Sequence, residues 1–132
     1  MKLNTIIPVA ILALGSSAAW AATTTLSTMP GDSQTVTDFY KQSVYDPHQN
    51  KIGDVDDVLL DKSGKVTALI IGVGGFLGAG EKDVAVPFSA VKNEKKSDKW
   101  YLTLDESKDN LKNAVGYKYD KASTTWTVDN KK

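Results

Sequence analysis

The stretch GVGGFLGAGEKDVAVPF, from Gly72 to Phe88, places five glycines around a Phe-Leu pair and continues into an alternating apolar segment. A dinucleotide-binding loop needs the pattern G-x-G-x-x-G at the start of a helix. Gly72 and Gly74 match the first half of that pattern, but Leu77 occupies the third glycine position. The residues that follow alternate like a strand, so no helix N-terminus is available to hold a phosphate group. The stretch therefore predicts a bend between two strands.

The glycines in this stretch predict a sharp turn, because glycine tolerates positive φ and close backbone approach. We expect Phe76 and Leu77 at the apex of the loop. They either fold back as a lid over the end of the core or form an exposed apolar tip that meets a partner, and the rarity of exposed apolar patches favours the lid. The candidate partner contact comprises Gly74, Gly75, Phe76, Leu77 and Gly78.

Short apolar segments with turn signals between them flank the glycine stretch, which is typical of all-β proteins. Strands are expected at Ser43–Tyr45, Lys51–Asp61, Lys65–Val73, Val84–Phe88 and Trp100–Asp105, with the charged residues 93–98 as a solvated hairpin tip. The segment Leu69–Ile71 is apolar on both faces, so it should lie between the core and a covering layer. The sequence predicts a small closed antiparallel β-barrel.

The sequence of the C-terminal part predicts one short helix, followed by a segment with two possible structures. Ser107 can cap a helix over Lys108–Ala114, and Gly116 follows as a stop signal. Aromatic and apolar residues then alternate between Tyr117 and Val128 around a DKAS turn. Two alternatives stay open for this end, a last hairpin and a loosely ordered tail.

The N-terminus has the features of a secretory signal peptide over residues 1–21. A short basic start precedes an apolar run from Leu3 to Leu14, and the triplet Ala19-Trp20-Ala21 fits the small-x-small cleavage rule. The run is about a dozen residues, whereas a membrane-spanning helix needs roughly 20, so we expect no stable membrane span after cleavage. The mature chain is expected to be periplasmic or secreted. Residues 22–35 read as a flexible leader, 36–119 as the domain and 120–132 as a tail or last strand.

The composition excludes several classes of function. All sixteen basic residues are lysine, thirteen of the sixteen acids are aspartate, and no cysteine is present. The chain therefore has no disulfides, thiol nucleophile or thiolate metal ligand. A near-neutral surface without arginine lacks the bidentate guanidinium fork typical of nucleic-acid and phosphate binders. We expect no nucleic-acid partner.

The aspartates of the DVDD segment, Asp54–Asp57, invite a calcium hypothesis but do not match the calcium-loop template. That template needs oxygen donors at the first, third and fifth positions, and the fifth position from Asp54 is Val58. Strand alternation predicts Asp54 and Asp56 on one face and Asp57 on the other, inside the rim of the barrel. We expect solvated side chains here, no metal site and no cofactor.

The only histidine, His48, lies in the turn Asp46–Asn50. A catalytic triad needs a base beside a nucleophile, and the sequence contains no G-x-S-x-G elbow or comparable motif. We expect His48 to be solvated and the protein to have no catalytic residue.

Residues Lys51–Val91 resemble a PRC-barrel domain. The matching features are an Ile-Gly pair that opens a strand, an Asp two residues after a Val, a Ser-Gly turn, the glycine loop and a VAVPF strand, found at Ile52-Gly53, Val55 and Asp57, Ser63-Gly64, Phe76-Leu77 and Val84–Phe88. The resemblance extends from about Val36 to Tyr119 and is strongest to exported single-domain proteins of Gram-negative bacteria. It implies a small β-barrel that serves as a docking surface, as in the reaction-centre H subunit and the ribosome maturation factor, and it carries over no catalytic residue.

The expected function is a periplasmic, non-enzymatic docking module that binds another protein or complex of the cell envelope, with a role in stress left open. The alternative is a small-ligand or metal-ion binding protein, for example an ion buffer that uses the aspartates. An enzyme is the third and weakest class.

Overall fold

The structure of the protein is a computed structural model that describes residue 15 and residues 24–76 and 80–130. The chain divides into two compact units, residues 1–33 and 34–132. In the first unit, the hydroxyl of Ser33 donates a hydrogen bond to the carbonyl oxygen of Pro30 at 2.7 Å. The second unit contains all of the helices and strands that the structure describes.

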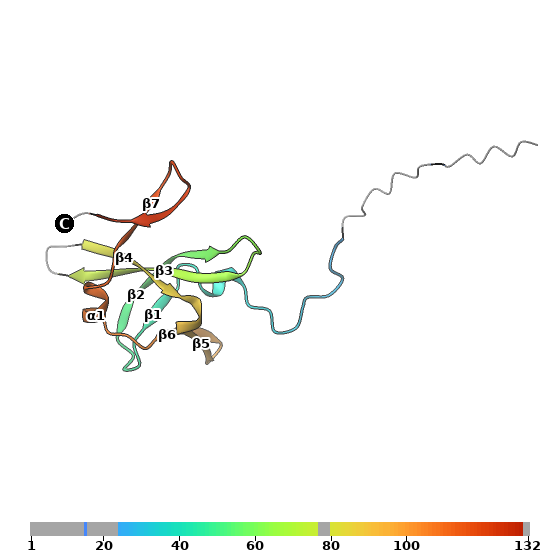
Figure 1. Ribbon diagram of the computed structural model, residues 1–132. Coiled ribbons are helices and arrows are strands. Elements are labelled where there is room, and N and C mark those ends of the chain that lie inside the picture. Colours follow the sequence, from blue (N-terminus) through green and yellow to red (C-terminus); the bar gives the residue numbers. More distant parts are fainter. Residues whose placement is uncertain (1–14, 16–23, 77–79, 131–132) are drawn as a thin grey trace, which may run out of the picture. The chain divides into compact units, whose positions relative to one another are not determined.

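The second unit is built mainly from strands, with little helix (Figure 1). The elements are η1 (Val36–Asp38), β1 (Ser43–Tyr45), β2 (Lys51–Leu60), β3 (Val66–Phe76), β4 (Gly80–Pro87), η2 (Phe88–Ala90), β5 (Val91–Lys96), β6 (Lys99–Leu104), α1 (Lys108–Lys112), β7 (Tyr117–Asp120) and β8 (Thr125–Val128). The predicted all-β class is confirmed.

The eight strands form one sheet in the order β5-β6-β1-β2-β3-β4-β7-β8. Neighbouring strands are antiparallel except β1 and β6, which run parallel with Val44 opposite Leu102. The prediction of a purely antiparallel sheet is wrong at this pair, because the long connection through β2 to β5 returns the chain to β1 in the same direction. Among the described residues the hydrogen-bonded ladder does not close, since β5 and β8 lie at its two ends.

The sheet curls around one hydrophobic core. Residues from β1, β2, β3, β4 and β6 share a single buried cluster with Phe39, which follows η1, and with Leu111 of α1. A flat sheet could not bring these residues together. The cluster comprises Phe39, Val44, Ile52, Val55, Leu69, Ile71, Val73, Val84, Val86, Leu102, Leu104 and Leu111. Its burial stabilises a chain without cysteines, at about 25 cal/mol per Å² of apolar surface removed from water.

Strand β3 is buried on both faces, as its sequence predicts. Leu69 and Ile71 belong to the core cluster. Ile70, which points to the opposite face by strand alternation, is fully buried and lies outside that cluster. A second layer therefore covers the outer face of the sheet at Ile70.

The glycine stretch is largely strand and not loop. β3 continues to Phe76 and β4 begins at Gly80, with Phe76 paired to Gly80 in the register. The expectation that Phe76 lies at a loop apex is therefore wrong for its backbone. Of the described glycines in this stretch, Gly80 has a positive φ, at 66°. No helix begins at Gly80, which agrees with the rejection of a phosphate-binding loop.

The charged segment 93–98 is also largely strand. β5 continues to Lys96, and the turn is limited to Ser97 and Asp98, whose φ angles are 50° and 62°. Two residues with positive φ are typical of a tight hairpin turn. Because β5 is an edge strand, it accepts charged side chains that a central strand would exclude.

The C-terminal part combines a short helix with a hairpin. The hydroxyl of Ser107 accepts a hydrogen bond from the backbone N–H of Asn110 at 3.1 Å, and Leu111 packs into the core. The helix ends at Lys112, earlier than the predicted Ala114. Strands β7 and β8 pair with each other, so the hairpin alternative is confirmed for this segment.

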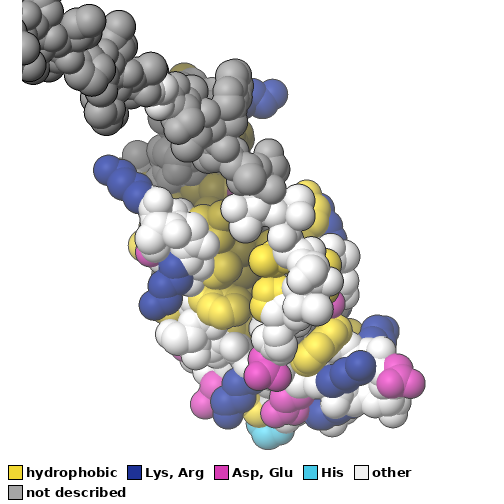
Figure 2. Space-filling model, turned by 90° about the vertical axis from the view of Figure 1, so that its right-hand side faces the viewer, with side chains coloured by type: hydrophobic (Ala, Val, Ile, Leu, Met, Phe, Trp, Pro, Cys, Tyr) yellow, Lys and Arg dark blue, Asp and Glu magenta, His cyan; other side chains and the backbone are white. Residues whose placement is uncertain are grey.

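One face of the molecule shows hydrophobic side chains gathered in a central hollow, with charged side chains of both signs around it (Figure 2). Throughout the described part of the chain, helices are too short or too polar to cross a membrane.

Candidate functional site

The predicted partner contact lies at the end of the β3–β4 hairpin. Gly74, Gly75 and the backbone of Phe76 are in β3, while Leu77 and Gly78 lie outside the described residues. The structure does not describe the side chains of Phe76 and Leu77, so both the lid and the exposed tip stay open.

The end of this hairpin extends past its register with the neighbouring strand β2. The register between β2 and β3 ends at Asp54 opposite Gly72. The register between β3 and β4 continues, with Val73 opposite Lys82 and Phe76 opposite Gly80. Beyond Gly72 the two strands therefore form a ribbon that is paired only with itself. A methyl group at Gly74 would meet no atom of the described residues within 4 Å, which leaves space beside this ribbon.

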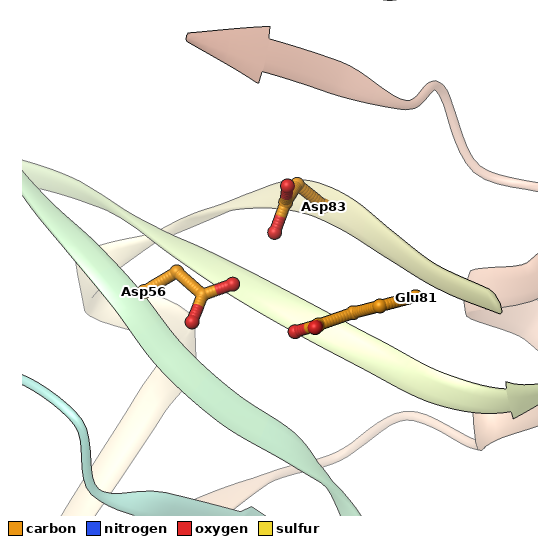
Figure 3. Close-up of side chains that lie close together, drawn as sticks. All are labelled: Asp56, Glu81 and Asp83. Carbon is orange, nitrogen blue, oxygen red and sulfur yellow. The ribbon is translucent and has the colours of Figure 1, made fainter.

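A second candidate feature is a trio of carboxylates that the sequence did not predict, formed by Asp56, Glu81 and Asp83 (Figure 3). One carboxylate oxygen from each residue lies within 4.8 Å of the others. Asp56 comes from β2, and the other two come from β4, on the far side of β3. We call these three residues the acidic trio.

Gly72 makes the acidic trio possible. It lies on β3 between the two strands that carry the acids, and it pairs with Asp83 on one side. A Cβ atom at Gly72 would overlap the carboxylate oxygens Oε1 of Glu81 and Oδ2 of Asp56. The absence of a side chain thus lets carboxylates from β2 and β4 meet above the middle strand.

A β-bulge brings Asp56 into the trio and also redirects Asp57. The register shifts between Val55 and Asp57, so that Asp56 is an extra residue and Asp57 lies opposite Ile70. Cross-strand partners share a face of the sheet, which places Asp57 on the outer face with Ile70. The prediction that Asp57 points inside the rim is wrong, because simple alternation does not hold across a bulge.

The environment of the trio favours protonation. Burial, followed by the hydrogen bond and negative charge of Asp56, raises the pKa of Asp83 to about 7. Partial loss of solvent around the largely exposed Glu81, followed by the charge of Asp56, raises the pKa of Glu81. Atom Oδ1 of Asp83 is buried and has no hydrogen-bond partner. A proton shared within the trio reduces both the repulsion and the cost of burying charge.

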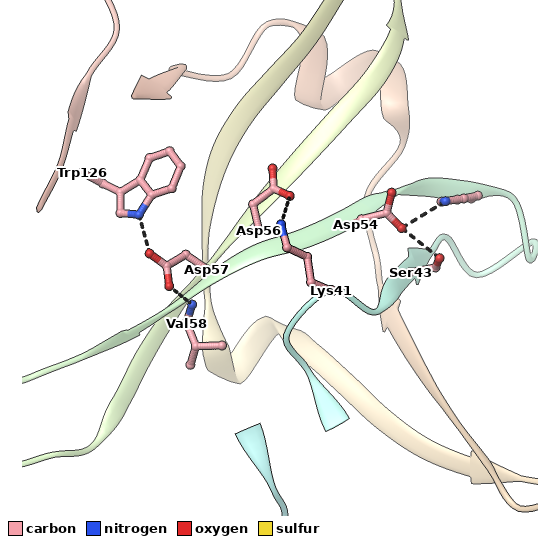
Figure 4. Close-up of polar contacts among 8 residues, drawn as sticks. Lys41, Ser43, Asp54, Asp56, Asp57, Val58 and Trp126 are labelled. Atoms are coloured by element: carbon pink, nitrogen blue, oxygen red, sulfur yellow. Dashed lines mark hydrogen bonds and ion pairs between the residues drawn. The ribbon is translucent and has the colours of Figure 1, made fainter. Parts of the chain in front are cut away.

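Among the described residues, Lys41 is the positive charge that forms an ion pair with the trio. The Nζ atom of Lys41 lies 3.6 Å from Oδ1 of Asp56, but the Lys41 side chain is largely exposed (Figure 4). Asp54, two residues before Asp56 on β2, forms an ion pair with Lys51 at 3.0 Å and accepts a hydrogen bond from the hydroxyl of Ser43 at 2.9 Å. An exposed ion pair such as Lys41–Asp56 contributes little to the stability of the fold.

Lys82 lies between the two acids of β4 in sequence but does not neutralise them. Its Nζ donates a hydrogen bond to the carbonyl oxygen of Lys112 at 2.6 Å, at the end of α1. Alternation along β4 places it on the opposite face from Glu81 and Asp83.

The chemistry that the trio supports is proton sharing. Clusters of exposed acids are common in proteins without a bound ion, so the convergence alone does not define a metal site. The sequence contained one usable signal, since Glu81 and Asp83 alternate on one face of β4. Their meeting with Asp56 depends on the register and on the bulge, which the sequence did not reveal.

The β7–β8 hairpin covers the outer face beside the trio. The indole Nε1–H of Trp126 donates to Oδ2 of Asp57 at 2.7 Å, while Oδ1 of Asp57 accepts from the N–H of Val58 (Figure 4). Because Asp57 and Ile70 share a face, this bond places Trp126 on the face that carries Ile70. On the sheet side, the register between β4 and β7 consists of the pair Asp83 and Tyr117.

A groove of about 630 Å³ lies on another part of the sheet. The rings of Tyr45 and Tyr101 lie in it with centroids 6.1 Å apart. Asp46 and Asp105 follow the carboxyl ends of the parallel strands β1 and β6, and Lys92 on β5 also lines the groove. His48 is exposed in the neighbouring turn, in agreement with its predicted solvation.

Comparison with known families gives a match over most of the second unit. The family model of the PRC-barrel domain matches residues 32–111. No curated protein sequence matches the chain.

Proposed function

Because the chain belongs to the PRC-barrel domain family, we propose that it is a non-enzymatic docking module that binds another protein or complex of the cell envelope. The N-terminal basic start, apolar run and small-x-small triplet support export to the periplasm. The shared core of the curled sheet supports a barrel that is closed in the manner of the family.

The observation that carries this proposal is the extension of the β3–β4 hairpin past its register with β2. Val73 belongs to the core, but beyond it the ribbon has free space beside Gly74 and can enter a groove on a partner. The partner contact is assigned to residues 74–78, which include Phe76 and Leu77.

Site-specific photo-crosslinking in intact cells tests this assignment. A photoreactive residue at Gly74 should capture one envelope protein, because its side chain would project into free space. The matched control is the same residue at Lys62, an exposed position in the turn between β2 and β3. Identical adducts from both positions, or no adduct from Gly74, would contradict the docking proposal.

A double substitution separates the two interpretations of the apolar pair. If Phe76 and Leu77 form an exposed tip, Phe76→Ser with Leu77→Ser should abolish the adduct and leave the Tm unchanged. A Tm lowered by several degrees would instead assign the pair to a core lid, since one lost core side chain costs about 2–5 kcal/mol.

The groove at Tyr45 and Tyr101 supports small-ligand binding as a second candidate function. Its volume lies in the range of about 300–1,000 Å³ that small-molecule sites occupy. Two aromatic rings with acids at one end and Lys92 alongside suit a small zwitterionic molecule with a planar apolar body.

Thermal-shift and NMR titrations with aromatic amino acids and short peptides test the second candidate. Binding should move the resonances of Tyr45 and Tyr101 and disappear in Tyr101→Ala, whereas the exposed Tyr119→Ala should still bind. Unchanged spectra throughout would remove this function.

A further inference from the structure

The C-terminal hairpin β7–β8 is joined to the rest of the sheet through carboxylate-bearing residues. One joint is the register pair of Asp83 with Tyr117, and the other is the hydrogen bond from Trp126 to Asp57. Cross-strand partners have side chains on the same face, so Tyr117 lies beside the carboxyl group of Asp83. The hairpin is therefore attached at a residue that also belongs to the acidic trio.

Negative charge gathers at this joint from two strands. β2 supplies Asp56 and, further off, Asp54, and β4 supplies Glu81 beside Asp83 itself. In the part of the chain that the structure describes, Lys41, from the segment before β1, supplies the opposing charge, and β7 supplies the neutral Tyr117. Full ionisation would therefore place three carboxylates within 4.8 Å of one another with a largely exposed lysine against them.

We propose that the β7–β8 hairpin is a pH-controlled flap, which stays on the sheet while the acidic trio holds a proton and lifts from it when all three carboxylates are ionised. Lifting hydrates the buried oxygen of Asp83 and lets the charges relax. It also breaks the hydrogen bond from Trp126 to Asp57 and exposes the outer face of the sheet at that residue. This inference does not depend on what the β3–β4 hairpin binds.

The direction of the pH effect follows from the thermodynamic linkage between proton binding at Asp83 and docking of the hairpin. Burial is the largest cause of the raised pKa of Asp83. Because Tyr117 is the cross-strand partner of Asp83, we infer that docking of the hairpin adds to this burial. A group whose pKa is higher in the docked state stabilises docking at low pH, and this stabilisation is lost as the pH rises through about 7. For each pKa unit that docking itself adds, the ratio of docked to lifted hairpin falls about tenfold between acidic and alkaline pH.

NMR of the full chain tests the flap. Two signals are followed from about pH 5 to about pH 8.5. The first is the indole N–H resonance of Trp126, which is assigned with the variant Trp126→Phe. The second is the amide hydrogen exchange of β7 and β8, corrected for the intrinsic pH dependence of exchange. The expected result is a transition near neutral pH in which the indole resonance moves and the hairpin amides lose protection. Amides of β3 at Leu69 and Ile71 should stay protected.

Two carboxamide variants link the transition to the trio. Asp83→Asn should remove the transition and keep the hairpin docked at all pH values. The matched control is Asp98→Asn, in the exposed β5–β6 turn, where asparagine also tolerates the positive φ of 62°. This control should keep the transition of the wild type.

Glu81→Gln keeps the proposal testable if Asp83→Asn fails to fold, because the Glu81 side chain is exposed. It removes one negative charge near Asp83, so it should move the midpoint to lower pH. The proposal is overturned if the wild-type hairpin shows no transition, if β3 loses protection at the same midpoint, or if Glu81→Gln leaves the midpoint unchanged.

Discussion

A Cβ atom at Gly53 would overlap the carbonyl oxygen of Gly72 and approach its carbonyl carbon to 2.9 Å. The obstacle is backbone, which cannot rotate away as a flexible side chain can. At Gly74 the same atom would enter open space. At the scale of single residues, close backbone packing thus requires glycine at position 53, whereas no steric contact with the described residues requires it at position 74.

We predict that Gly53→Ala lowers the free energy of unfolding by about 1–3 kcal/mol, because the added methyl group forces β2 and β3 apart. Gly74→Ala, with the same chemical change, should alter it by less than about 0.5 kcal/mol. Urea denaturation of both variants measures the difference. Equal effects at the two positions would show that close packing does not explain Gly53.

At the scale of elements, the β7–β8 hairpin depends on its aromatic side chains. Trp126 bonds to Asp57, and its ring meets Tyr119 edge to face with centroids 5.8 Å apart. Such aromatic pairs contribute about 0.5–1.5 kcal/mol beyond the area that they bury. A hairpin with one register pair to its neighbour relies on contacts of this kind.

Trp126→Phe should weaken the attachment of the hairpin by about 1–2 kcal/mol, because Asp57 loses its indole donor. Amide exchange of β7 and β8 at fixed pH measures this loss, and core amides such as that of Val84 should not change. Tyr119→Phe retains the ring pair and serves as the control. If both variants exchange alike, the bond to Asp57 does not hold the hairpin.

The individual elements show which parts of the fold and of the candidate site can be predicted from the sequence. The run of β-branched and apolar residues around Ile70 correctly predicted a strand there, and Ser107 correctly predicted the start of α1. The alternation that served there failed at Asp57, because a bulge depends on pairing between strands and not on the local pattern. The same dependence on register hid the acidic trio, whose members become neighbours only across Gly72.

At the scale of the whole molecule, two sets of aspartates give opposite pH dependence. The pKa of Asp83 is raised, so its stabilisation of the fold is full below the ordinary value of 3.8 and is lost as the pH rises through about 7. Hydrogen bonds from Asn50, Ser63 and Ser123 lower the pKa of Asp46, Asp61 and Asp120, respectively. These turn residues stabilise the fold above their ordinary pKa and lose that effect as the pH falls.

We therefore predict greatest stability at mildly acidic pH, with a decline toward alkaline pH of about 1–2 kcal/mol after solvent screening of the partly exposed Asp83 is allowed for. Urea denaturation as a function of pH measures the curve. Asp83→Asn should flatten the alkaline side and leave the acid side unchanged. A wild-type curve that rises steadily to alkaline pH would contradict this account.

The parallel pair of β1 with β6 has a consequence for the order in which the chain assembles. Val44 and Leu102 lie far apart in the chain, so the segments between them must fold before the two residues can pair. Strands β2, β3 and β4 can form earlier through their local hairpins, because contacts between distant residues close slowly. During folding, one edge of β1 thus stays unpaired, and the partly folded chain is most open to mispairing until the β5–β6 hairpin packs against β1.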